Sequence, residues 1–186
     1  IPKSLNPIVA SKLTCVMTKP LPETREQTLS YKARDDIMAM SQRAQVVALG
    51  PGLSQNPDTK RLVLYLLENL GGCLVVDADA INALAEKPDV LDKVKAEIIL
   101  TPHPGEMDRL MGLNQSNSSR IRSRRVEVVT EFVKRHPHVI LVLKGHKTLV
   151  AHRDELYECT TGNPGMASAG TGDVLTGLIA GLWAQR

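Results

Sequence analysis

Aromatic residues, cysteines and excess charge are all scarce in this sequence. Its 186 residues include three Tyr, one Phe and one Trp, too few to interleave with basic side chains on a nucleic-acid-binding surface. The net charge of +3 is also too small to predict a nucleic-acid partner. Cys15, Cys73 and Cys159 are far apart and lack the spacing of a zinc site or a disulfide framework. We therefore expect reduced, mostly buried thiols in a cytoplasmic protein.

Long apolar runs are absent as well. No stretch approaches the roughly 20 residues that a membrane helix needs, and no signal peptide precedes the first strand-like run, so no membrane partner is expected. With 42% hydrophobic and 23% charged residues, the composition is that of an ordinary globular protein. The length suits a single domain, residues 1–186. The chain opens on Ile1-Pro2 rather than Met, which favours a piece of something longer.

What the sequence does contain is a regular alternation of strand-like and helix-like segments. The short apolar runs typical of buried parallel strands cover residues 46–49, 73–77, 98–100 and 139–143. A hairpin is predicted for residues 148–151 and 156–159, turning at Arg153-Asp154. Alternation of this kind predicts an α/β fold, an open and mostly parallel sheet with helices on both faces.

Caps and apolar stripes predict where the helices lie. Asn56-Pro57-Asp58 is a helix start, and Gly71-Gly72 is its stop. Its inner stripe is Val63, Leu66, Leu67 and Leu70. Shorter helices are expected after Asp77 and over 106–111. Residues 116–119 can cap a longer helix, whose inner face is Ile121, Val128, Val129, Phe132 and Val133.

Residues 1–45 carry weaker signals and no visible chemistry. A strand is expected over 13–17, a proline-containing loop over 18–25 and a helix over 35–43.

Several residues that can do chemistry follow the predicted strands directly. They are Gly50-Pro51-Gly52, Asp77, His103 and Lys144-Gly145. In an open parallel sheet, ligands bind beyond the carboxyl ends of the strands. We therefore expect these residues along one edge of the sheet, together with Asp173.

The most informative stretch is the glycine-rich segment 163–177. It holds four glycines, three small hydroxyl residues and one acid, Asp173, and it continues into an apolar helix. The helix should begin near Gly172-Asp173, so its first-turn N–H groups and its dipole favour an anion. Its expected buried face is Val174, Leu175, Leu178, Ile179 and Leu182. Asp173 can act as a base toward a hydroxyl that attacks a phosphate, or it can merely cap the helix.

The stretch Gly170-Thr171-Gly172-Asp173 resembles the anion-hole motif of the ribokinase-like superfamily. The longer form, Gly-Asn-Pro-Gly-Met-Ala-Ser-Ala-Gly-Thr-Gly-Asp-Val-Leu-Thr-Gly, resembles the NAD(P)H-hydrate dehydratases within that superfamily. The similarity extends over Val46 to Leu182 and includes Gly-Pro-Gly at residues 50–52 and Thr-Pro-His-Pro-Gly-Glu at 101–106. It implies a ribokinase-like three-layer α/β/α fold, which we expect to be truncated at both ends.

The resemblance also assigns roles to individual residues. Gly52, His103 and Asp173 would contact the hydrated cofactor, NAD(P)HX, and Asp173 would be the catalytic base. The nucleotide would be bound by Lys144, Gly145, His146, Lys147, Thr148, Gly170, Thr171 and Gly172. A magnesium ion on the nucleotide is expected to be held largely by phosphates and water, with no protein ligand. The phosphoryl donor would be ADP or ATP.

The activity implied is nucleotide-dependent dehydration of NAD(P)HX back to NAD(P)H, a metabolite-repair reaction. Two alternatives stay open: a ribokinase-like kinase of a thiazole or pyrimidine alcohol, and a nucleotide-binding protein without turnover. The resemblance further suggests a homo-oligomer, possibly a tetramer, and a fused or partner epimerase domain.

Other charged residues have competing interpretations. Glu106 can order a metal or water near the phosphates or sit in the first turn of its helix, where an acid suits the dipole. Asp77 is a candidate site carboxylate, whereas Asp79 is interpreted as a helix cap. The basic run Arg120, Arg122, Arg124 and Arg125 is interpreted as the solvated outer face of its helix.

Overall fold

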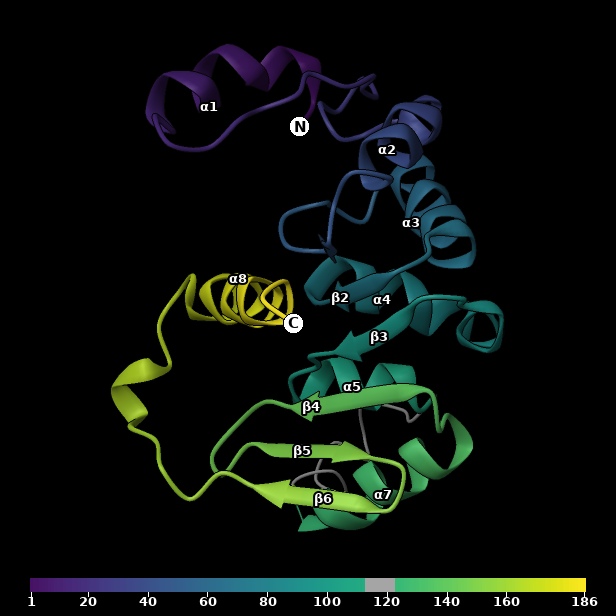
Figure 1. The fold of residues 1–186 in the computed structure, drawn as a ribbon, viewed down its shortest axis with the longest axis vertical. Helices are drawn as coiled ribbons and strands as arrows, with labels where there is room; N and C mark the ends of the chain where they lie inside the picture. The colour runs from purple at the N-terminus through teal and green to yellow at the C-terminus, as the bar shows by residue number, and fades with distance from the viewer. Residues whose placement is uncertain (113–122) are drawn as a thin grey trace.

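The computed structural model describes residues 1–112 and 123–186. Within them, six strands form one sheet in the order β1-β2-β3-β4-β5-β6 (Figure 1). The strands are β1 (Val46–Leu49), β2 (Cys73–Val76), β3 (Glu97–Leu100), β4 (Val139–Leu143), β5 (Leu149–His152) and β6 (Glu155–Glu158). The first four are parallel, and the last two continue the sheet as an antiparallel hairpin. The four predicted parallel strands and the hairpin are therefore confirmed.

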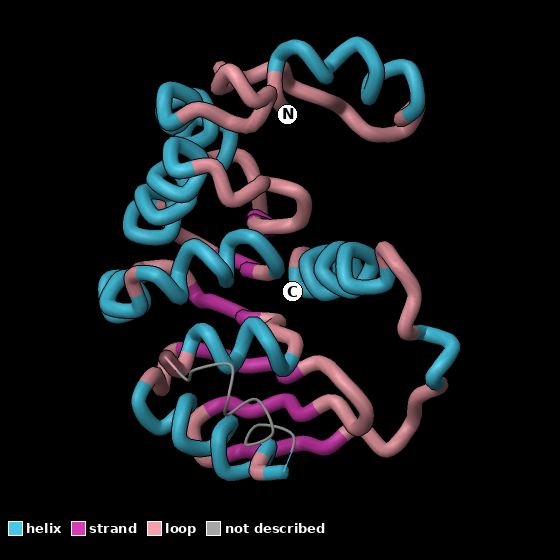
Figure 2. Tube along the Cα trace, turned by 180° about the vertical axis from the view of Figure 1, so that it is seen from behind, coloured by secondary structure: helices cyan, strands magenta, loops and turns pink. Residues whose placement is uncertain are grey.

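Helices cover both faces of this sheet, as predicted. One face carries α3 (Pro57–Asn69), α4 (Ala78–Glu86), α5 (Pro104–Leu110) and α7 (Arg125–Arg135), and the opposite face carries α8 (Thr171–Trp183), as the two opposed views show (Figures 1 and 2). Leu74, Val76 and Leu100 face the large helical layer, whereas Val75 and Ile99 pack with Trp183 of α8. Because apolar side chains point to both faces, the strands are continuous apolar runs without alternation.

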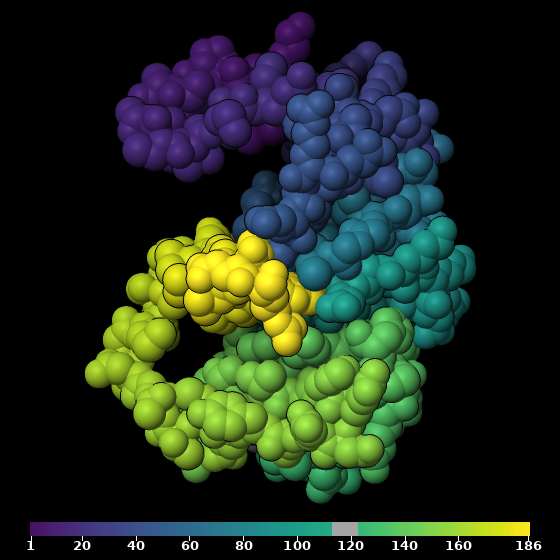
Figure 3. All heavy atoms as spheres, viewed as in Figure 1, coloured from purple at the N-terminus to yellow at the C-terminus, as the bar shows by residue number. Residues whose placement is uncertain are grey.

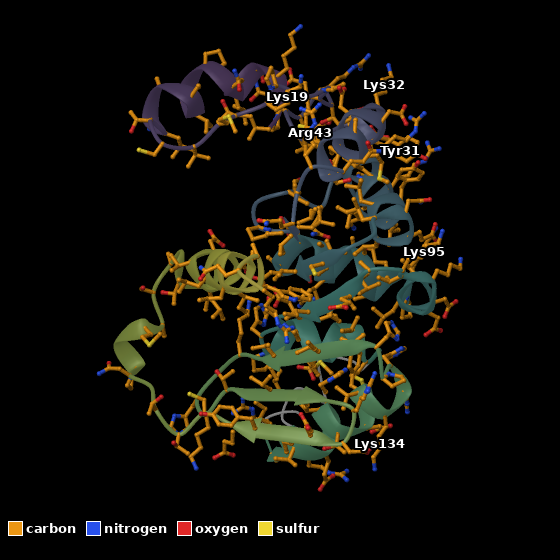
Figure 4. All side chains as sticks on the ribbon, viewed as in Figure 1. Lys19, Tyr31, Lys32, Arg43, Lys95 and Lys134 are labelled. Carbon is orange, nitrogen blue, oxygen red and sulfur yellow. The ribbon has the colours of Figure 1, made fainter. Side chains whose placement is uncertain are left out.

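Local capping explains why α3 begins where it does. The side chain of Asn56 accepts hydrogen bonds from the N–H groups of Asp58 (2.9 Å) and Thr59 (3.4 Å). The predicted stripe of Val63, Leu66, Leu67 and Leu70 is buried. The guanidinium of Arg61 in α3 stacks on the ring of Tyr31 (Figure 4), with its Cζ atom 3.8 Å from the centroid of that ring.

The N-terminal segment agrees only in part with the sequence interpretation. It contains α1 (Asn6–Lys12) and α2 (Arg34–Ser41), and α2 confirms the predicted helix. The strand predicted over 13–17 is wrong: the segment forms a loop in which Met17 is fully exposed. Residues 18–25 lie outside any helix or strand, as predicted. Short 3-10 helices are η1 (Lys3–Leu5), η2 (Tyr31–Ala33), η3 (Pro88–Lys93) and η5 (Pro164–Met166).

Two further expectations concern α7 and the cysteines. The inner face of α7 is buried as predicted, through Val128, Val129, Phe132 and Val133. The structure does not describe residues 113–122, which include the expected cap at 116–119 and the side chains of Arg120, Ile121 and Arg122.

The expectation of mostly buried thiols is wrong, because Cys15 is exposed and Cys73 and Cys159 are half-buried.

The buried face of α8 also differs from the prediction. Val174, Leu178 and Leu182 are 61%, 57% and 67% exposed, whereas the helix rests on β1 and β2 through Thr176 and Trp183. The helix is apolar around most of its circumference, so its periodicity did not single out the face that meets the sheet. Among the described residues, no helix is long and apolar enough to cross a membrane.

Gly50 shows how closely the loop after β1 packs against the end of β2. A Cβ at this position would lie 1.7 Å from the carbonyl oxygen of Asp77, and the φ of Gly50 is +136°. We expect Gly50→Ala to lower the free energy of unfolding by at least about 3 kcal/mol, because the clash adds to the backbone strain. Denaturant unfolding measures this. The control Gly71→Ala, with no atom within 4 Å of its new Cβ, should cost less than about 1 kcal/mol; equal losses would contradict the explanation.

Candidate active site

The sheet brings the predicted site residues to one edge. Hydrogen bonds carry the strand pairing one residue beyond the strands: Asp77 N–H donates to Leu49 (3.0 Å) and Thr101 N–H to Val76 (3.1 Å). Lys144 N–H donates to the carbonyl of Pro102 (2.8 Å). These bonds fix Asp77, the loop at His103, and Lys144 at the carboxyl ends of neighbouring parallel strands, where ligands of such sheets bind.

Asp77 and Lys144 form the central ion pair of this edge. The Nζ of Lys144 lies 2.6 Å from Oδ1 of Asp77 and 3.9 Å from Oε2 of Glu106. The other carboxylate oxygen of Asp77 accepts a 2.8 Å hydrogen bond from the hydroxyl of Thr176 in α8. Asp77 is 1% exposed. One buried carboxylate therefore connects β4 and α8, which cover very different parts of the sequence.

Opposing influences act on the pKa of Asp77. Burial raises it, but hydrogen bonds from Lys144 and Thr176 and the charge of Lys144 outweigh burial and hold the pKa below the ordinary 3.8. A carboxylate with a lowered folded-state pKa stabilises the fold above its unfolded pKa. That contribution is lost as the pH falls through the folded value.

A pH prediction follows for Asp77→Asn. The wild type should be the more stable protein at neutral pH, because Asn leaves Lys144 without its counter-charge. Below about pH 4, protonation of Asp77 removes the same interaction from the wild type, so the difference in free energy of unfolding should narrow. Denaturant unfolding at several pH values measures this difference. A difference that stays constant down to pH 2 would show that the charge of Asp77 contributes nothing.

His103 and Glu106 cap α5 reciprocally. Nδ1 of His103 accepts hydrogen bonds from the N–H groups of Gly105 (3.0 Å) and Glu106 (3.2 Å), while Glu106 accepts the N–H of His103 (2.8 Å). Nε2 of the ring lies 3.3 Å from Glu106. The helix-start interpretation of Glu106 is thus confirmed, and its role toward a metal or water stays a prediction. Half of the His103 side chain is exposed at this edge.

The glycine-rich segment approaches the pair of Asp77 and Lys144 from the face of the sheet that carries α8. Residues 161–170 are all exposed and arch outward before α8 begins (Figure 3). A Cβ on Gly172 would lie 3.8 Å from Nζ of Lys144 and 3.9 Å from Oδ2 of Asp77. The first turn of α8 therefore lies against the Lys144 ammonium.

The start of α8 keeps N–H groups free of a capping side chain. Its N-cap is Gly170, at φ +85°, which has no side chain to accept a hydrogen bond. The N–H of Thr171 donates to the carbonyl of Ser168 (3.3 Å). The contacts of Gly170, Thr171 and Gly172 with a nucleotide stay predictions. Asp173 lies in this first turn and is exposed. Exposed N–H groups, a helix N-terminus and an ammonium together suit a phosphate.

Gly52 lies in the loop after β1, and Asp79 of α4 binds that loop. The cap assigned to Asp79 is wrong: its carboxylate accepts hydrogen bonds from Ser54 N–H (2.7 Å) and the Gln55 amide (2.8 Å), and Asp77 occupies the N-cap of α4. Asp79 is used instead to hold this loop, which includes a residue with positive φ, Ser54. Gly52 is exposed, and a Cβ added there would have no atom within 4 Å, so a ligand can approach it.

The segment 144–148 carries the predicted nucleotide contacts. Hydrogen bonds hold two of its carbonyls: that of Gly145 accepts the hydroxyl of Thr148 (3.1 Å), and that of Thr148 accepts the N–H of Cys159, which follows β6 (2.8 Å). Lys147 pairs with Glu158 of β6 (3.2 Å). His146 is exposed.

Two residues at this edge are not evident from the sequence. Thr176 is one of several small residues in an apolar helix, and no signal marks it. The solvated-face interpretation is wrong for Arg125, which is half-buried and whose guanidinium donates to the carbonyls of Leu143 and His146. The sequence shows only that Arg125 belongs to a basic run. Whether its side chain faces the sheet depends on how α7 is rotated about its axis, which the sequence does not show.

The acidic side chains bear on whether the protein itself could hold magnesium. Among residues 1–112 and 123–186, no three His, Cys, Asp or Glu side chains come together in a group that could hold a metal. Both oxygens of Asp77 are used by Lys144 and Thr176, and Glu106 is used by His103. The Asp77 carboxylate therefore does not fit a protein-held ion.

Comparison with known proteins agrees with the fold and the motifs. A ribokinase-like superfamily protein from Enterococcus faecalis superposes with a TM-score of 0.77 at 24% identity, covering 99% of this chain and 59% of that one. The fold is therefore ribokinase-like. Residues 6–186 match the NAD(P)H-hydrate dehydratase family, and this chain belongs to that family.

Two relatives make the similarity specific. The bifunctional NAD(P)H-hydrate repair enzyme Nnr of Moorella thermoacetica is 45% identical over 186 residues, which are 100% of this chain and 34% of Nnr. The ADP/ATP-dependent NAD(P)H-hydrate dehydratase of Bacillus subtilis, co-crystallised with ATP and Mg2+ and soaked with CoA, is 27% identical. Its TM-score is 0.70, and the match covers 98% of this chain and 61% of that one. The chain thus spans about a third of the length of the Moorella Nnr.

Proposed function

We propose that this chain supplies the catalytic domain of an enzyme that restores hydrated NADH and NADPH to NAD(P)H with ADP or ATP as phosphoryl donor. The observation that carries the proposal is the approach of Gly172, in the first turn of α8, to the pair of Lys144 and Asp77. Asp173 is the next residue of that turn and is exposed. In a member of the NAD(P)H-hydrate dehydratase family, this arrangement suits phosphoryl transfer to a hydroxyl.

The first step would be phosphorylation of the added hydroxyl on the nicotinamide ring. Asp173 accepts the hydroxyl proton as the oxygen attacks the terminal phosphorus, and AMP or ADP leaves with the electrons of the broken phosphorus–oxygen bond. N–H groups of the first turn of α8 stabilise the charge on the transferring group, at about 3 kcal/mol per donor. Lys144 adds an ammonium beside Gly172.

The second step would be elimination. Hydroxide is a poor leaving group near neutral pH, whereas phosphate is a good one. The lone pair of the ring nitrogen expels phosphate, and loss of a proton from the adjacent ring carbon restores the reduced nicotinamide. The hydroxyl oxygen therefore ends in phosphate and not in water.

Binding of the two substrates would be divided along the edge. Gly52 and the exposed side of His103 contact NAD(P)HX together with Asp173, and Lys144, Gly145, His146, Lys147 and Thr148 contact the nucleotide with Gly170, Thr171 and Gly172. Mg2+ would arrive on the nucleotide phosphates, where it neutralises charge, held there by phosphate oxygens and water.

The remaining parts of the proposal concern the whole protein. Residues 1–186 would act as one ribokinase-like domain in a cytoplasmic homo-oligomer. The proposal includes a fused or partner epimerase domain, and the bifunctional Nnr relatives are consistent with a second activity in the same chain.

A product assay tests this function. The protein is incubated with enzymatically hydrated NADH, magnesium, and either ADP or ATP. The proposal predicts that reduced-nicotinamide absorbance returns with equal amounts of released phosphate, only when nucleotide is present. A stable phosphorylated product without NADH would identify a kinase, and nucleotide binding without either product would identify a non-catalytic binder.

A further inference from the structure

Arg125 lies at the start of α7, directly behind the segment 144–148. Its Nη2 donates to the carbonyl of Leu143 (3.2 Å), and its Nη1 donates to the carbonyl of His146. The two carbonyls flank Lys144 and Gly145. One guanidinium therefore holds the end of β4 and the loop that follows it at a fixed separation, which its planar fork suits.

The loop that Arg125 holds has unusual backbone angles. Gly145 has φ +137° and Lys147 has φ +55°, an uncommon value for a residue with a side chain. The carbonyl of His146 belongs to the same peptide as the N–H of Lys147, and these two groups point in opposite directions. By binding that carbonyl, Arg125 turns the N–H of Lys147 away from itself and holds the positive φ of Lys147.

Arg125 is itself anchored to the sheet through α7. It is the first residue of α7, whose buried face of Val128, Val129, Phe132 and Val133 packs on β4 and β5. Burial lowers the pKa of Arg125, partly opposed by the charge of Glu158, but a guanidinium stays protonated at any pH that the fold tolerates.

We infer that Arg125 is a positioning residue for nucleotide binding, which it supports by fixing the conformation of residues 144–148. The inference rests on the proposed function, because the nucleotide is assigned to this segment there. Arg125 acts through the backbone of the loop and need not touch the phosphates.

The adjacent Arg124 provides a matched control. Its guanidinium pairs with Glu127 of the same helix, and its side chain is 51% exposed. Arg124→Met and Arg125→Met remove the same charge from neighbouring positions, so any general attraction of a polyphosphate is lost equally from both. Arg125→Lys keeps the charge but replaces the two-pronged donor by a single ammonium.

Three measurements on the same proteins test the inference. Calorimetric titration with MgADP and MgATP should show the dissociation constant raised about tenfold by Arg125→Met, less by Arg125→Lys, and under about twofold by Arg124→Met. Hydrogen exchange without nucleotide should be faster over residues 143–149 in both Arg125 variants, and unchanged there in Arg124→Met. In the product assay, KM for the nucleotide should rise while KM for hydrated NADH and kcat stay near wild-type values.

The outcomes separate the two proposals. If the wild type binds neither nucleotide, the proposed function fails and the role of Arg125 fails with it. If the wild type binds nucleotide and Arg125→Met binds it equally well, only the Arg125 inference is overturned. Weakened binding with unchanged exchange over 143–149 would also overturn it, because Arg125 would then contact the nucleotide directly.

Discussion

Asp173→Asn should reduce the nucleotide-dependent return of NADH by roughly 10²–10⁴-fold, the range typical for loss of a general base. The amide keeps the size and the hydrogen-bonding oxygen of Asp173 but cannot accept the hydroxyl proton. Asn also remains acceptable at a helix start, so the fold should be kept. Initial rates at saturating nucleotide and substrate measure the loss, with circular dichroism as a check on folding.

The control for this prediction is another exposed acid. Asp154 lies in the turn between β5 and β6, and Asp154→Asn should retain wild-type rates. The affinity for MgADP should be similar in Asp173→Asn and the wild type, because a base acts on the hydroxyl and not on the bound nucleotide. Gly170 and not Asp173 is the N-cap of α8, so an Asp173→Asn protein with more than half of wild-type activity would contradict the assignment of Asp173 as the general base.

Lys144→Met should destabilise the fold by about 3–5 kcal/mol, the usual result of leaving one charge of a buried pair alone. Asp77 is 1% exposed, and without Lys144 its carboxylate keeps only its hydroxyl partners. The same change should also weaken nucleotide binding, because the ammonium beside Gly172 is lost. Chemical denaturation and titration with MgADP measure the two effects separately.

The matched control is the exposed pair of Lys147 and Glu158, where Lys147→Met should cost less than about 1 kcal/mol. Adding Asp77→Asn to Lys144→Met should restore much of the stability, because the buried Asp77 charge is removed with its partner and the amide can still accept from Thr176. Nucleotide binding should stay weak in the double variant. Two single losses that simply add would contradict a direct interaction between Asp77 and Lys144.

Much of the fold is predictable because its signals are local. A continuous apolar run bounded by glycine or an acid specifies a strand such as β1 or β2, and an Asn-Pro-Asp start specifies α3. The failures occur where local pattern does not determine tertiary contact. The apolar run at 13–17 has no sheet to join. Because α8 is apolar on nearly every side, the buried face predicted for it is only partly right: Leu175 and Ile179 are half-buried, and Ile179 packs toward the sheet, whereas the other three residues are exposed.

The site is predictable where residues follow strands, because parallel strands bring their ends together. That rule places Asp77, His103 and Lys144 on one edge from the sequence alone. It does not indicate that Asp77 joins Lys144 to Thr176, since the partners are 67 and 99 residues away. Nor does it show that Arg125, unlike Arg124, faces inward, because the two differ only by a rotation about the helix axis.

The most direct test of the central claim follows the oxygen of the ring hydroxyl. Hydrated NADH is prepared with a heavy oxygen isotope in the added hydroxyl and converted by the protein with ADP or ATP. Phosphorylation followed by elimination predicts that the released phosphate carries the label, in an amount equal to the NADH restored. Label found in water with unlabelled phosphate would mean that hydroxide leaves directly and nucleotide cleavage is a separate reaction, which contradicts the mechanism.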